Sequence, residues 1–70
     1  MINYKKTGML LKEYRCKNNY TLGGLSKEFP KLVLYECGQL LPTVAELKRL
    51  SILYKCKMDD LVFWERDESI

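Results

Sequence analysis

A chain of 70 residues has room for one domain with a single small core. Its composition, 47% hydrophobic and 30% charged, excludes a disordered chain. The chain has no histidine, and its three cysteines (Cys16, Cys37 and Cys56) are far apart, which argues against a metal site or a redox pair. We expect the cysteines to be small buried side chains in a reducing compartment.

The net charge of +3 is unevenly distributed along the chain. Residues 1–35 carry seven lysines and arginines against two glutamates, a net of +5, whereas residues 36–70 carry five against seven acids, a net of −2. A basic first half attracts polyanions such as nucleic acid, although an ordinary lysine-rich surface explains the charge equally well. No signal peptide and no apolar run of about 20 residues is present, so we expect a cytoplasmic protein that does not bind membranes.

The spacing of apolar residues predicts helices throughout and no substantial sheet. The first helix is expected from about Thr7 to Asn18, ended by Asn18-Asn19 because asparagine tolerates the left-handed conformation. Thr21 is expected to cap a short second helix that Gly23-Gly24 weakens. Pro30 is expected to end the second helix and to begin a third one.

The remaining elements have clearer local signals. The third helix is expected to reach Cys37, with Gly38 closing it. Thr43 followed three residues later by Glu46 predicts a capping box, and with it a fourth helix that runs to about Lys55. A last helical piece is expected to open at Asp59-Asp60, where negative charge meets the positive end of the helix. The predicted core comprises Leu11, Tyr14, Leu25, Phe29, Leu32, Leu47, Leu50, Leu53 and Leu61.

Five groups of residues, in register over residues 7–63, resemble the lambda repressor/Cro-type helix-turn-helix family. They are Gly8 with Leu11–Arg15, Tyr20-Thr21 with Leu25-Ser26, Tyr35–Gly38, Pro42–Leu47 with Leu50, and Met58–Leu61. The resemblance implies an all-α, compact five-helix bundle at residues 7–64, with an N-terminal arm at 1–6 and a frayed tail at 65–70. It also implies a transcriptional regulator that binds double-stranded DNA, with contacts at Lys12, Arg15, Thr21, Lys27, Lys31 and Gln39.

The sequence departs from the family at the element that reads DNA bases. Between Thr21 and Glu36 it is about four residues shorter, roughly one helical turn, and Pro30 replaces the polar start of the recognition helix. Apolar residues stand where the family faces nucleic acid: Leu22, Val33, Leu34, Leu40 and Leu41. Because these side chains cannot donate hydrogen bonds to phosphates or base edges, we expect mainly electrostatic, weakly sequence-specific DNA binding.

The same five apolar residues define an alternative function, a protein-interaction module on a helix-turn-helix scaffold. Such a module fits an antirepressor, a regulator subunit or a phage-type inhibitor, with a protein partner or a second copy on this face. Joint exposure of Val33, Leu34, Leu40 and Leu41 favours this alternative, and their burial beside exposed Lys27 and Lys31 favours DNA. An enzyme, a cofactor, a metal and a small-molecule substrate are not expected, since no histidine, phosphate-binding glycine loop or activated nucleophile is present.

Overall fold

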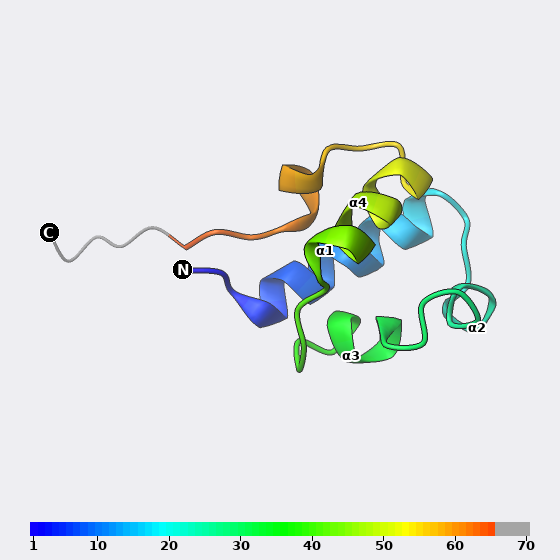
Figure 1. The fold of residues 1–70 in the computed structure, drawn as a ribbon, viewed down its shortest axis with the longest axis horizontal. Coiled ribbons are helices and arrows are strands. Elements are labelled where there is room, and N and C mark those ends of the chain that lie inside the picture. Colours follow the sequence, from blue (N-terminus) through cyan, green and yellow to red (C-terminus); the bar gives the residue numbers. More distant parts are fainter. Residues whose placement is uncertain (66–70) are drawn as a thin grey trace, which may run out of the picture.

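The computed structural model describes residues 1–65, which form four α-helices followed by one 3-10 turn (Figure 1). The elements are α1 (Tyr4–Lys17), α2 (Leu22–Leu25), α3 (Leu32–Glu36), α4 (Val44–Leu53) and the 3-10 turn η1 (Met58–Leu61). Over these residues there is no strand, only an isolated antiparallel β-bridge between Ile2 and Trp64. The prediction of an all-α globule is confirmed, and the fifth expected helix is a 3-10 turn.

Helix α1 begins three residues earlier than predicted because Asn3 caps it. The Asn3 side-chain oxygen accepts a hydrogen bond from the Lys6 amide at 2.9 Å, which satisfies one of the unpaired donors of the first turn. At the other end Asn19 adopts φ +62°, the left-handed conformation that the sequence predicts. The N-terminal arm therefore comprises residues 1–3 instead of 1–6.

Helices α2 and α3 are short, and the turn between them carries Pro30. The Thr21 hydroxyl accepts from the Gly24 amide at 3.1 Å, so the predicted cap of α2 is confirmed. Helix α3 begins at Leu32, which shows that the predicted start at Pro30 is wrong by two residues. It ends at a left-handed glycine, Gly38 with φ +77°, where the Gln39 amide donates back to the Leu34 carbonyl at 3.0 Å.

Helix α4 begins where the capping-box sequence predicts, but only half of the box forms. The Thr43 hydroxyl accepts from the Glu46 amide at 3.2 Å, while the Glu46 carboxylate accepts from the Tyr35 hydroxyl on α3. Lys55, which follows α4, adopts φ +56°. In η1 the Asp60 carboxylate accepts from the Lys57 amide at 3.1 Å, so the acidic start predicted for this element caps it.

The core is formed by side chains from all five elements and the segments that join them. Six of the nine predicted core residues are buried, and the other three (Tyr14, Leu47 and Leu53) are half-buried against the core. The prediction missed Tyr35 and Tyr54, which are both buried. The complete set of buried apolar residues is Leu11, Leu25, Phe29, Leu32, Tyr35, Leu50, Tyr54 and Leu61.

The N-terminal arm lies alongside the segment that follows η1 (Figure 1). The Asn3 amide donates to the Phe63 carbonyl at 2.9 Å, and the Phe63 amide donates to the buried Thr7 hydroxyl at 3.0 Å. Glu65, placed in the predicted frayed tail, donates its amide to the Met1 carbonyl at 2.7 Å. The rest of that tail, residues 66–70, lies outside the described residues.

Candidate nucleic-acid interface

Two glycines bring α1 and α3 into backbone contact. A Cβ atom at Gly8 would lie 2.5 Å from the Tyr35 carbonyl oxygen and 2.6 Å from that of Glu36, closer than carbon and oxygen can approach. A Cβ atom at Gly38 would lie 2.9 Å from the Lys5 Cα. The position of α3 relative to α1 is therefore set by residues that have no side chain.

A buried ion pair joins the same two helices. The Arg15 Nε and the Glu36 Oε2 are 2.7 Å apart, and a second Arg15 nitrogen donates to the Glu36 Oε1 at 3.1 Å. The third guanidinium nitrogen donates to the Tyr20 carbonyl at 3.0 Å. The hydrogen bond to Glu36 raises the pKa of Arg15 above its usual value, against the opposing effect of burial. Because the Arg15 side chain is only 10% exposed, we correct its predicted role as a phosphate contact to one inside the fold.

Two tyrosines of the core, Tyr35 on α3 and Tyr54 directly after α4, are buried. Burial, and then the hydrogen bond to Glu46, raise the pKa of Tyr35 to about 12. The Tyr54 ring packs at 6.1 Å, centroid to centroid, from the ring of Tyr20, and burial raises the pKa of Tyr54 as well. The Tyr54 hydroxyl has no hydrogen-bond partner among the described residues. These tyrosines hold elements together and present no group to solvent.

The lysines predicted to contact DNA are on the surface. Lys12 lies on α1, Lys27 in the turn after α2, and Lys31 at the N-terminal end of α3; all three are exposed, as is Gln39. In residues 1–65 the only ion pair is Arg15–Glu36, so no acid neutralises these lysines. Thr21 is also exposed, but its hydroxyl is occupied as the cap of α2.

The positive charge of the described chain belongs to its first three helices. Residues 1–41 hold seven lysines and arginines against three glutamates, a net of +4, whereas residues 42–65 hold four of each sign. Since Arg15 and Glu36 neutralise each other, six exposed lysines remain against exposed Glu13 and Glu28. The exposed positive charge therefore favours the binding of a polyanion to residues 1–41 over residues 42–65.

The apolar residues predicted as an alternative interface separate into two groups. Val33 is 42% exposed, Leu34 is 39% exposed and Leu40 is 37% exposed, which is the exposure that the protein-interaction hypothesis requires. Leu22 is half-buried against the core, and Leu41 is half-buried beside a groove of about 260 Å³. Of the four residues whose exposure separates the two hypotheses, Val33, Leu34 and Leu40 are exposed and Leu41 is half-buried, which favours a protein contact, while the exposed Lys27 and Lys31 leave DNA binding open. These three apolar residues remain as a candidate surface.

Two of the three cysteines are exposed, although the sequence predicts that all three are buried. Cys16 and Cys37 are exposed and Cys56 is half-buried, so the expectation of three buried cysteines is wrong for two. Cys37 lies one turn after Val33 and Leu34, on the outward side of α3. We call Val33, Leu34, Cys37 and Leu40 the α3 patch. A signal for Cys37 was present in the sequence, because Gly38 marks the end of the helix immediately after it.

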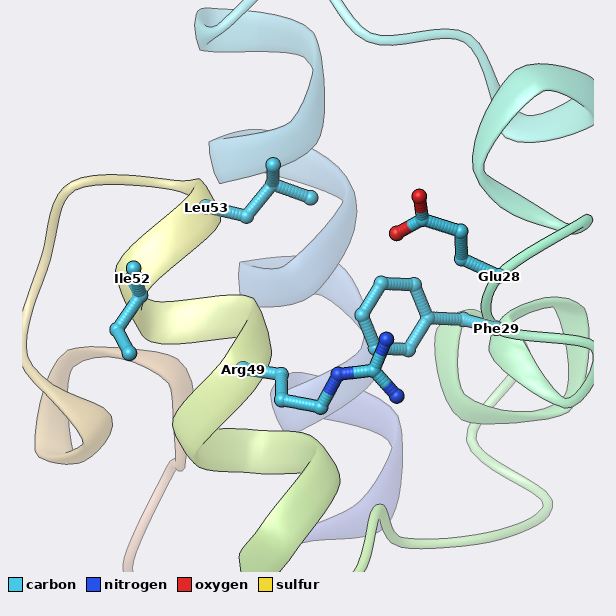
Figure 2. A pocket seen from close by; sticks show the side chains of 5 residues that line it. All are labelled: Glu28, Phe29, Arg49, Ile52 and Leu53. Carbon is cyan, nitrogen blue, oxygen red and sulfur yellow. The ribbon is translucent and has the colours of Figure 1, made fainter.

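Figure 2 shows a separate shallow pocket between α4 and the turn that precedes α3. Its volume is about 230 Å³, and Arg49 and Leu53 from α4 point toward Glu28 and Phe29, with Ile52 also among the lining residues. The Arg49 guanidinium lies over the Phe29 ring, 4.8 Å from its centroid. Within residues 1–65 no group of three or more His, Cys, Asp or Glu side chains is placed to hold a metal ion. The pocket holds no nucleophile beside a base and presents packing contacts only.

Comparison with protein-family models, with curated proteins and with solved structures found no match for this chain. None of the helices in the described part of the chain is long and apolar enough to cross a membrane. The function is therefore inferred from the arrangement of the residues themselves.

Proposed function

We propose that this chain is a regulator of the helix-turn-helix type that binds double-stranded DNA through phosphate contacts. The observation that carries the proposal is the charge distribution: six exposed lysines on the α1–α3 half, with the net charge of the other half at zero. Duplex DNA carries one negative charge about every 1.7 Å of its axis, so clustered lysines bind it by releasing counterions.

The residues that resemble the repressor family support this scaffold, because they are the ones that join α1 to α3. Gly8 gives the close backbone approach, Arg15 and Glu36 form the buried pair, and Gly38 ends α3. Residues scattered over 30 positions of the sequence thus serve one packing arrangement.

The same structure argues that sequence preference is weak. Helix α3 has five residues, and its outward side carries Val33, Leu34 and Cys37, none of which can read a base edge by strong hydrogen bonds. Among the predicted DNA contacts, Gln39 is the one residue with an amide side chain that could read a base, and it is exposed. Affinity then comes from Lys12, Lys27 and Lys31, whose contacts to phosphates carry no direct sequence information.

A titration of random-sequence duplex DNA at several salt concentrations tests the proposal. The triple variant Lys12→Gln, Lys27→Gln, Lys31→Gln should lower the slope of log affinity against log salt by about 0.9 for each phosphate that the protein no longer neutralises. The matched control removes three exposed lysines of the other half, at Lys48, Lys55 and Lys57, and should change the slope little. Absence of binding at low salt, or an equal reduction of the slope in the two triple variants, would contradict the proposal.

A second candidate function, a protein contact at the α3 patch, is favoured by a different observation. Val33, Leu34 and Leu40 are each more than a third exposed, although burying such side chains is worth roughly 1.5–3 kcal/mol apiece. Single exposed apolar side chains are common, and Met9, Val44, Ile52 and Trp64 are more exposed than these three. The second candidate therefore rests on Val33, Leu34 and Leu40 lying together at one short helix. A protein contact at the α3 patch does not use Lys12 or Lys27, so mutation can separate it from DNA binding.

A further inference from the structure

The members of the α3 patch lie at one end of the helix because of the way α3 ends. Leu32 and Tyr35 are buried, which leaves the outward side of the helix to Val33, Leu34 and Cys37. At Gly38 the chain turns back, and the hydrogen bond from the Gln39 amide to the Leu34 carbonyl places Leu40 at the same end of the helix. Figure 1 shows α3 and this turn at the border of the molecule.

A lysine lies at each end of α3. Lys31 is the N-cap residue of the helix and stands three positions before Leu34. Residues three apart on a helix are neighbours on its surface. At the other end the Lys5 backbone lies against Gly38. The only acid on α3, Glu36, is held inside by Arg15 and is 7% exposed. The apolar side chains therefore lie between two lysines and have no exposed acid on their own helix.

We propose that the α3 patch binds an acidic amphipathic helix of a partner protein. Apolar side chains of that helix, spaced three and four residues apart, contact Val33, Leu34 and Leu40, and its carboxylates meet Lys5 and Lys31. The inference deepens the second candidate function and rests on it, by stating the chemistry of the partner.

Charge and shape favour an acidic helix over two other occupants, a second copy of this chain and a lipid surface. A second copy of this chain on the α3 patch would bring Lys31 and Lys5 against their own equivalents, which opposes association. A lipid surface is bound by a helix that buries a large apolar face in it, whereas α3 has five residues and its outward apolar side chains are only about 40% exposed. A helix with one apolar and one acidic face matches both the apolar centre and the positive ends.

The experiment uses a fluorescent 18-residue helical peptide with leucines on one face and glutamates on the other. Fluorescence anisotropy should show binding to the whole chain, weakened at least tenfold by Leu34→Asp and several-fold by Lys31→Gln. The matched control is Ile52→Asp, at an exposed position on α4, which should bind like the parent. A peptide with lysines in place of the glutamates should not bind. Thermal melting of each variant shows that it is folded, and Leu34→Gln, a neutral change, replaces Leu34→Asp if the charge unfolds the chain.

Four results would overturn the inference. They are equal binding of the lysine peptide, unchanged binding by the Leu34 variants, Leu34-dependent binding to vesicles of anionic lipid without binding to the glutamate peptide, and self-association that Leu34→Asp abolishes. The DNA titration on the Leu34→Gln variant is a separate measurement, and it should match the parent. Failure of peptide binding therefore leaves the DNA proposal standing, and a failure of DNA binding through the lysines leaves the peptide result intact.

Discussion

The α1–α3 half and the α4–η1 half of this molecule are held together by different means. In the first, two helices meet through the backbone at Gly8 and through the buried pair of Arg15 and Glu36. In the second, a ten-residue helix capped by Thr43 packs its apolar side on the core, with Leu50 fully buried. The net charge is +4 for residues 1–41 and zero for residues 42–65.

The difference shows how a small domain can keep an unusual surface. Helices of four and five residues are too short to be stable by themselves, and they need specific contacts to hold their place. The glycine contact and the ion pair supply these contacts without using the outward sides of α2 and α3. The lysines and the α3 patch are thereby left exposed on the half of the molecule that contains the two shortest α-helices.

The largest effect should come from breaking the buried pair. Glu36→Ala leaves the Arg15 guanidinium buried without its carboxylate, and such a change costs about 3–5 kcal/mol. The comparison in the other half is Asp60→Ala, which removes an exposed cap at the Lys57 amide and should cost about 1 kcal/mol. Urea unfolding measures both. Equal decreases in the free energy of unfolding would mean that the two halves are not held by different means.

A smaller effect is expected where α1 meets α3. Gly8→Ala places a methyl group against two carbonyl oxygens of α3, and overpacking of this kind costs about 1–3 kcal/mol. Gly23→Ala is the matched control, because no atom lies within 4 Å of the Cβ position at Gly23 and alanine is the better helix former. The first change should lower the melting temperature, by about 4–8 °C for each kcal/mol, and the second should raise it slightly. An unchanged melting temperature in Gly8→Ala would show that α3 is not fixed by backbone contact.

The smallest effect lies in the second half, at the end of α4. Lys55 has φ +56°, a conformation that costs a side-chain-bearing residue about 1–2 kcal/mol. Lys55→Gly should stabilise the chain by roughly 0.5–1 kcal/mol, since the greater freedom of glycine in the unfolded state offsets part of the gain. The reciprocal change, Gly38→Ala, should destabilise it. If thermal melting shows that Lys55→Gly destabilises the protein, the lysine side chain makes a contact that outweighs the strain.

The features that were predictable from the sequence are local ones. Thr21 and Thr43 cap helices because a hydroxyl and an amide three residues apart are sufficient, and Asn19 adopts the left-handed conformation expected of it. Apolar spacing likewise identified most of the core. The start of α1 was missed because Asn3 caps it while its backbone is held by Phe63, 60 residues away.

The candidate site was predictable only in part, because its decisive contacts join distant residues. Arg15 looks like any surface cation until Glu36, 21 positions later, is placed beside it. Glu46 carries a capping signal but turns to the Tyr35 hydroxyl. Exposure of Val33, Leu34 and Cys37 depends on the rotation of a five-residue helix, which has too few residues for periodicity to define.

The pairing of the N-terminal arm with residues 63–65 has a consequence for the order of events during synthesis. A ribosome delivers Asn3 and Thr7 early, but their partner Phe63 is made about 60 residues later. The cap between Asn3 and Lys6 can form early, whereas the hydrogen bonds of Asn3 and Thr7 to Phe63 must wait for nearly the whole described chain. The joining of the N-terminal arm to residues 63–65 is therefore among the last contacts that synthesis allows.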